Sequence, residues 1–175
     1  MLHTTSQRRS HIVGVVLILS FGASSAPSAA AAGVSEASGY TTATGPIDRD
    51  LEGFFFFDSL TGELKAVALN PRTKQFVAVF SRKINEDFSP KGEARSGQRF
   101  LMATGVANLS PEPGVTWRWA ASAIYVTELN SGVVAAYGIK LPQNLRNVPA
   151  RQPIVGDITP FDKLELREKS QPSDP

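Results

Sequence analysis

The sequence predicts an all-β fold, an antiparallel meander of about six to seven short strands, and three observations lead to this prediction. From residue 51 on, short apolar runs are bounded by turn residues. Nowhere do apolar residues keep the 3.6-residue period of a helix over a useful length. The composition, 42% hydrophobic and 19% charged, is that of an ordinary foldable chain of about one domain. A small sandwich, an open barrel and a partial propeller-like sheet all satisfy these observations.

The N-terminal segment predicts a signal peptide. Arg8 and Arg9 precede an apolar run over residues 12–23 that is far shorter than a bilayer span. Small residues follow at 24–33, where Ala-x-Ala patterns suit cleavage. We therefore expect residues 1–32 to be removed and the protein to be extracytoplasmic, periplasmic or secreted, without a membrane attachment. An uncleaved anchor is the alternative.

Removing this segment changes the chemistry that the chain can perform. His3 and His11 are its two histidines, both lie in the predicted signal peptide, and the sequence contains no cysteine. Without imidazole or thiol, the exported chain cannot use Ser-His-Asp or Cys-His catalysis, His-ligated haem or the usual zinc sites. It also cannot form disulfides, so its stability must come from an apolar core. We expect no cofactor and no enzymatic activity.

The charge balance argues against two classes of partner. The whole chain has 18 Lys plus Arg against 16 Asp plus Glu, and loss of Arg8 and Arg9 makes the exported chain neutral. Binding to nucleic acid or anionic lipid needs basic side chains clustered on one face, whereas here both signs are interspersed. We therefore exclude nucleic acid and anionic membrane surfaces as partners.

The expected domain begins near residue 50. Residues 33–49 are rich in Gly, Ser, Thr and Ala without apolar periodicity, which predicts a flexible leader. A three-stranded meander is then expected at residues 53–58, 63–69 and 75–81. Its turns contain Thr61-Gly62, where glycine tolerates positive φ, and Asn70-Pro71, where proline fixes φ. Four consecutive phenylalanines at 54–57 predict a central strand that buries side chains on both faces.

The second half of the chain continues the strand pattern. Residues 82–98 predict a charged, exposed connection, and strands are expected at 99–107, 123–129 and 133–139. Asn130-Ser131-Gly132 predicts the clearest hairpin turn. The domain thus spans 50–141. The prolines of the tail, residues 142–175, disfavour long helices and central strands, but 163–167 alternates polar and apolar residues and predicts a closing edge strand.

Two segments repeat one pattern. Residues 58–69 and 127–139 each contain a strand, a Thr-Gly or Ser-Gly turn and a second strand, and these hairpins resemble the inner hairpin of a β-propeller blade. Four blades of about 40 residues exceed the length of the exported chain. The whole pattern over 53–139 also resembles a family of short secreted bacterial proteins without an assigned function. That resemblance implies an exported, all-β protein and implies no catalytic or binding residue.

One acidic segment resembles the start of a calcium loop. Asp48, Asp50 and Glu52 alternate before Gly53, and oxygen ligands at such spacing suit a hard cation. The twelfth position is Ser59 instead of a bidentate Glu, so the pattern then departs from a calcium loop. The alternative is a solvated acidic lead-in to the first strand.

Aromatic residues provide a second candidate site. Trp117 and Trp119 flank Arg118, and residues two apart in an extended segment share a face. With Tyr125 or Tyr137, the two indoles are candidates for a flat platform that binds a sugar ring. The alternative is that one indole packs on the sheet, because Trp is mostly buried.

These features give three functional hypotheses. The first is a structural or protein-interaction module of the bacterial cell envelope, which binds an envelope protein or a second copy through open sheet edges. The second is a carbohydrate-binding module that uses Trp117 and Trp119. The third is a calcium-dependent activity or a hydrolase that uses paired carboxylates, for which Asp58, Glu63 and Glu128 are candidates.

Overall fold

The computed structural model describes residues 35–37, 39–89, 97–110, 112–143, 145 and 152–167. The predicted signal peptide lies outside them. The first half of the chain contains β1 (Ser35–Ala37), β2 (Tyr40–Asp48), β3 (Leu51–Asp58), β4 (Glu63–Asn70), β5 (Gln75–Lys83) and one helical turn, α1 (Asn85–Phe88). The second half contains β6 (Phe100–Val106), β7 (Trp117–Trp119), β8 (Ser122–Glu128), β9 (Val133–Pro142) and β10 (Ile154–Glu165). The all-β prediction is confirmed.

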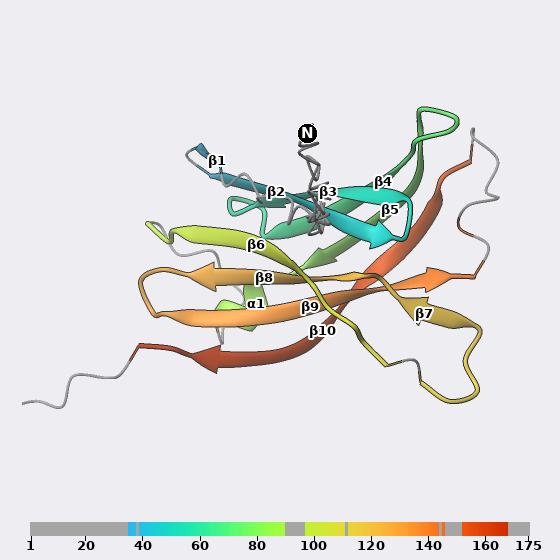
Figure 1. The fold of residues 1–175 in the computed structure, drawn as a ribbon. Helices are drawn as coiled ribbons and strands as arrows, with labels where there is room; N and C mark the ends of the chain where they lie inside the picture. The colour runs from blue at the N-terminus through green and yellow to red at the C-terminus, as the bar shows by residue number, and fades with distance from the viewer. Residues whose placement is uncertain are drawn as a thin grey trace, which may run out of the picture.

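The strands form one sheet that curls into a nearly closed barrel (Figure 1). Its order is β1-β2-β3-β4-β5-β10-β9-β8-β6, with β7 added beside β9. Among the described strands, β5 and β10 pair in parallel and the other pairs are antiparallel, so the sheet is mixed rather than the expected antiparallel meander. The predicted meander at 53–81 is present as β3, β4 and β5.

Three turns share one pattern of side-chain hydrogen bonds and backbone conformation, which explains the repeat seen in the sequence. The first residue of each turn, Asp58, Asn70 or Glu128, accepts hydrogen bonds from the backbone N–H groups two and three residues later. The fifth residue, Gly62, Lys74 or Gly132, has a positive φ of 69°, 57° or 75°. A short polar side chain and a residue in the left-handed region are what such a turn requires. The repeat therefore reflects turn chemistry, and the hairpins belong to a barrel.

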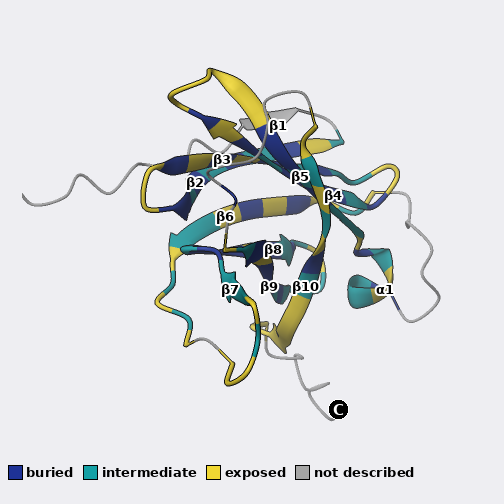
Figure 2. Ribbon diagram, turned by 90° about the vertical axis from the view of Figure 1, so that its right-hand side faces the viewer, coloured by how far each residue is buried: buried dark blue, intermediate teal, exposed yellow. Residues whose placement is uncertain are grey.

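The four phenylalanines of β3 do not all enter the core. Phe55 and Phe57 are fully buried inside the barrel, whereas Phe54 is 44% exposed and Phe56 is half-buried on the outside. Figure 2 shows this alternation along β3. The strand is central, since β2 and β4 flank it, but the prediction of burial on both faces is wrong. A barrel has one apolar interior, so alternate residues of β3 face outward, where Phe56 stacks on the ring of Tyr40 with centroids 5.4 Å apart.

The expected flexible leader contains a strand of the barrel. β2 pairs with β3 along its length, and Thr41, Ala43 and Ile47 are buried. The prediction for 33–49 is therefore wrong at 35–37, where β1 pairs with β2, and from residue 40 on. Its low apolarity has a steric cause, because a Cβ at Gly45 would lie 2.9 Å from Thr104 Oγ1 and 3.0 Å from Ser122 Oγ. Small residues are needed where β2 meets β6.

The barrel is nearly closed at this contact. The hydroxyl of Thr104 on β6 donates to the carbonyl of Thr44 on β2 at 2.6 Å. Close by, the N–H of Ala121 donates to the carbonyl of Ile47 at 2.9 Å. These two bonds replace a regular ladder, so the edges of β2 and β6 face one another rather than solvent.

The C-terminal strand also differs from its prediction. β10 covers Ile154–Glu165, lies between β5 and β9, and is therefore not an edge strand limited to 163–167. Pro160 is tolerated because the register with β9 shifts between Pro160 and Asp162, which leaves Phe161 as an extra residue. The domain thus extends beyond the expected 50–141, from β2 to β10.

Glu128 provides a test of the turn pattern. Burial alone raises the pKa of this carboxyl, but hydrogen bonds from the Ser131 hydroxyl and from the N–H groups of Asn130, Ser131 and Arg99 outweigh it, so the pKa lies below the usual 4.5. The folded state then binds fewer protons than the unfolded chain, and this stabilisation is present above pH 4.5 and is lost as pH falls through the lowered pKa.

We therefore expect Glu128→Gln to cost about 1 kcal/mol at neutral pH, because the two N–H groups lose a charged acceptor. In urea unfolding followed against pH, the variant should lose less stability than the wild type on acidification below pH 4.5. Glu52→Gln, at an exposed position of β3, is the control and should match the wild type. An equal acid dependence in Glu128→Gln and wild type would contradict this assignment.

Candidate functional site

The sheet has a split between β5 and β10. The two strands pair over Ala78–Ser81 and Ile154–Asp157. β5 then ends at Lys83 and leads into α1, while β10 continues to Glu165 beside β9. Beyond Asp157, no described strand pairs with the second edge of β10. Figure 2 shows α1 set apart from the strands on this side of the barrel.

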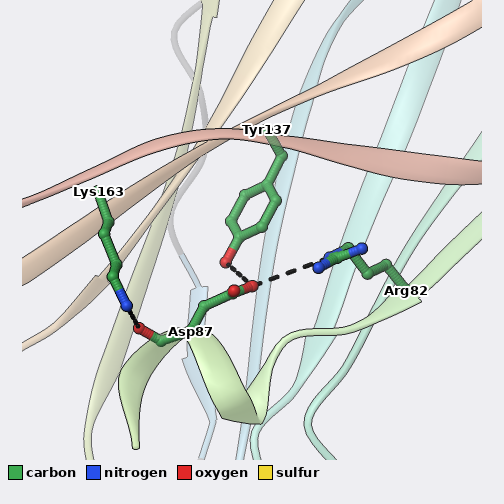
Figure 3. A network of polar contacts seen from close by, with 4 residues as sticks. All are labelled: Arg82, Asp87, Tyr137 and Lys163. Carbon is green, nitrogen blue, oxygen red and sulfur yellow. Dashed lines mark hydrogen bonds and ion pairs between the residues drawn. The ribbon is translucent and has the colours of Figure 1, made fainter. Parts of the chain in front are cut away.

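A polar network centred on Asp87 occupies the split (Figure 3). The Tyr137 hydroxyl, from β9, donates to Asp87 Oδ2 at 2.9 Å. Arg82 Nε, from the end of β5, lies 3.8 Å from the same oxygen. From β10, Lys163 Nζ donates to the backbone carbonyl of Asp87 at 3.5 Å. The network thus joins α1 to the three strands that border the split.

The chemistry of Tyr137 is that of a neutral donor. Burial raises the pKa of its phenol far above 10.0, and the nearby charge of Asp87 and the hydrogen bond to it raise the pKa further, against a smaller lowering by Arg82. A phenol that stays protonated at physiological pH does not act as a general base. The network therefore holds α1 beside the strands through a neutral phenol and two cationic side chains.

Two adjoining hollows lie along this split. One has a volume of about 220 Å³ and is lined by Asp87, Ala135, Ala136, Tyr137, Pro160, Phe161, Asp162 and Lys163. The other, of about 460 Å³, is lined by Glu86, Asp87, Phe88, Ser89, Val133, Lys163, Leu164 and Glu165. Asp87 and Lys163 line both. The hollows therefore form one trough, which we call the β10 trough, crossed by the contact between these two residues.

The predicted aromatic site lies on the outer face. Trp117 and Trp119 share a face, as expected for alternate residues of a strand, but their rings meet edge to face at 76°, with centroids 4.9 Å apart. Trp119 meets Phe161 in the same way at 81°, and Lys140 Nζ lies 4.4 Å from the centre of the Trp117 ring. Perpendicular indoles do not form the flat platform that we expected for a sugar ring.

The two tyrosines of that prediction lie on opposite faces. Tyr125 is on the outer face of β8 and 41% exposed. Tyr137 is fully buried and donates to Asp87, so it does not join the two indoles on the outer face. Residue spacing does not predict this difference, because it depends on which face of each strand is turned toward the core.

The predicted metal ligands do not come together. Asp48 is buried and paired with Arg118, whose Nη2 lies 2.5 Å from Asp48 Oδ2. Asp50 and Glu52 are exposed. Within the described ranges, no group of three His, Cys, Asp or Glu side chains is placed to hold a metal ion.

The candidate hydrolytic carboxylates are engaged in local structure. Asp58 and Glu128 accept the turn hydrogen bonds already described, and Glu63 forms an ion pair with Lys65 at 3.0 Å. Asp58 and Glu128 thus occupy equivalent positions of two different turns. Their side chains stabilise those turns, which is the simpler account of why both residues are acidic.

The outer face carries an apolar row that the sequence analysis missed. Cross-strand pairing places Phe54, Val67, Val79 and Val155 side by side across β3, β4, β5 and β10. Leu69 and Phe76 form the next pair along the strands. The exposed fractions are 44% for Phe54, 42% for Leu69, 55% for Phe76 and 80% for Val155. We call these six residues the outer apolar face.

The sequence contained part of the signal for this surface. In a half-buried strand one of the two alternating sets should be polar, whereas 54–57 is apolar at both. Burial on both faces and exposure of one apolar face are the two explanations, and the sequence does not distinguish them. Arg82, Asp87 and Lys163 carried no such signal, because they lie far apart in the chain.

Comparison of the chain with protein-family models, curated proteins and solved structures gives no match. In the part of the chain that the structure describes, no helix has the length and apolarity to cross a membrane.

Replacing Tyr137 by Phe tests the Asp87 network. Folded Tyr137 keeps its proton above pH 10.0, where the unfolded phenol ionises, so its contribution to stability is fully present below pH 10.0 and is lost as pH rises. We expect Tyr137→Phe to lower the free energy of unfolding by about 1–2 kcal/mol at neutral pH and to reduce its alkaline decline. Tyr125→Phe is the exposed control. Ionisation of Tyr137 in the folded protein near pH 10 would contradict this.

Gly138→Ala tests the packing of the aromatic cluster. A Cβ at Gly138 would collide with the ring of Phe161, which is 37% exposed and can turn outward. Trp119 then loses its edge-to-face partner, a contact worth about 1 kcal/mol. We expect red-shifted tryptophan emission and a comparable loss of stability. Gly105→Ala is the control, because its Cβ would lie 3.6 Å from Tyr125 Cε2, an ordinary contact; equal emission from both variants would contradict the packing.

Proposed function

We propose that this protein is a non-enzymatic structural or protein-interaction module of the cell envelope that docks through the outer apolar face. The observation that carries the proposal is the row of Phe54, Val67, Val79 and Val155, which continues across four paired strands. Isolated apolar residues on a surface are ordinary, but a contiguous patch of this kind is typical of an interaction site. The core of protein interfaces is likewise apolar and rich in aromatic side chains.

The position of this surface on strands favours docking of a preformed partner. Each strand is held on both sides by a neighbouring strand, so the side chains need little ordering on binding. Burying each large apolar side chain contributes about 1.5–3 kcal/mol before the costs of association. Phe54, Leu69, Phe76 and Val155 together supply the apolar centre of an interface.

A second copy of the chain is the partner that we propose to test first. The sequence led us to expect self-association through open sheet edges, but β2 and β6, near the two ends of the sheet, face one another across the closure and are not open there. The outer apolar face takes over that role. Two such faces can pack against each other in the way that two sheets pack face to face, with their apolar side chains interdigitating.

The non-enzymatic part of the proposal has separate support. Asp58 and Glu128, the carboxylates expected for hydrolysis, accept hydrogen bonds within their own turns. Tyr137 is kept neutral by its surroundings. These side chains stabilise the fold, so we assign the proposed function to the outer apolar face.

Sedimentation velocity over a wide concentration range tests this proposal. We expect the wild type to self-associate and Val155→Ser, alone or with Phe76→Ser, to shift the protein toward monomer. Val106→Ser is a matched control, because Val106 and Val155 are each 80% exposed but Val106 lies at the end of β6 outside the outer apolar face. The control should associate like the wild type. A wild type that stays monomeric, or a control as impaired as Val155→Ser, would overturn docking through this face.

A further inference from the structure

The β10 trough is a second candidate binding surface, because it combines a strand edge that no described strand pairs with and a hollow beside it. Beyond the bulge at Phe161 this edge runs from residue 162 to 165, where β9 pairs with one side of β10 and no described strand pairs with the other. At about 3.3 Å per residue, the edge is long enough for about four residues of an extended peptide. Strand edges of this kind recognise extended peptides through main-chain hydrogen bonds.

The register shows which main-chain groups face the trough. The N–H of Leu166 donates to the carbonyl of Gly132, and Leu164 lies opposite Val134 in the same register. Hydrogen-bonded residues alternate along an antiparallel ladder, so the groups of Lys163 and Glu165 point away from β9. In agreement, the N–H of Lys163 donates to its own neighbour, the Asp162 carboxylate, at 2.8 Å.

The contact that crosses the trough is weak. Lys163 Nζ reaches the Asp87 carbonyl at 3.5 Å, at an exposed position. An exposed bond of this length costs little to break. Asp87 itself stays fixed, because its carboxylate is held by Tyr137. An incoming strand therefore needs to move the Lys163 side chain and the Asp162 carboxylate, and α1 remains in place as the second wall.

The charge of the walls selects the kind of peptide. The two hollows are lined by the carboxylates of Glu86, Asp87, Asp162 and Glu165 and by the ammonium of Lys163. The Asp87 carboxylate already pairs with Arg82, so the selection by charge depends on Glu86 and Asp162. Glu86 and Asp162 are exposed and lie on opposite walls. Complementary charge across an interface favours the right partner and repels one of like charge. An acidic peptide is therefore disfavoured.

We propose that the β10 trough binds an extended, basic peptide segment of another protein, which adds as a strand to the edge of β10 beside α1. The Lys163 N–H exchanges its bond to Asp162 for a carbonyl of the peptide, and the freed carboxylate pairs with a Lys or Arg of the peptide. This proposal does not rest on docking through the outer apolar face, since the two surfaces use different residues.

The test titrates the purified protein with a fluorescent, end-capped peptide of alternating Val and Lys, about six residues long, and follows its anisotropy. Two matched peptides are the controls: one alternates Val and Glu, and one carries the Val-Lys sequence with alternate backbone amides methylated. We expect the Val-Lys peptide alone to bind. Equal binding of the acidic or the methylated peptide, or no binding of any, would overturn the proposal.

Protein variants locate the site. Glu86→Gln with Asp162→Asn keeps an acceptor for the Lys163 N–H but removes two charges, and should weaken binding about fivefold. Glu112→Gln with Asp157→Asn makes the same change in net charge at exposed positions that line neither hollow, and should leave binding unchanged.

Amide hydrogen exchange gives a readout of strand addition itself. The Lys163 N–H should exchange more slowly when the Val-Lys peptide is bound, because a main-chain bond replaces an exposed local one. Binding without a change at Lys163 would overturn the proposal. Val155→Ser should bind the peptide like the wild type, so a failure of the outer apolar face and a failure of the trough are separate results.

Discussion

The parallel pairing of β5 with β10 is the contact on which the rest of the structure depends. It joins the N-terminal meander to the strands of the second half. About seventy residues separate the paired segments, so forming the pair costs loop-closure entropy, which neither strand can offset without the other. The pairing stops at Ser81 and Asp157. Because β5 turns away there, one edge of β10 has no described strand beside it, α1 comes to lie near it, and Asp87 reaches Tyr137 and Arg82. One short ladder therefore joins the two halves of the sheet and creates the split.

A second constraint is the narrow interior. Phe55, Phe57, Phe80 and Tyr137 are all fully buried, and a barrel of about eight strands is just wide enough for its side chains to fill it. Where β2 approaches β6 there is room for small residues, as at Gly45. Since the core occupies the inside, the recognition that we propose uses the outside of the described barrel, at the outer apolar face and the β10 trough. The same crowding explains why β2 is rich in small residues, as a flexible leader would be, although it is a strand of the barrel.

The acidic residues have two kinds of structural role, which differ in whether the partner is near or distant in the sequence. Asp58 and Glu128 stabilise turns, and that role follows from the sequence once the turn is recognised, because the hydrogen bonds span three residues. Asp48 and Asp87 act on partners 70 and 50 residues away. Sequence spacing cannot predict these partners. For the same reason Asp48, Asp50 and Glu52 formed a plausible ligand pattern in the sequence and not in space.

The sequence by itself determined the all-β class, the meander of β3, β4 and β5, the hairpin of β8 and β9, and the turns between them. These features depend on alternation, Gly, Asn-Pro and polar side chains within a few residues of each other. The tertiary structure alone decided that β2 and β10 are strands, which face of β3 is exposed, and that Tyr137 meets Asp87. Each of these depends on which distant strand lies alongside. The free energy of pairing depends on two remote segments together, so the sequence of either segment alone does not predict the pairing.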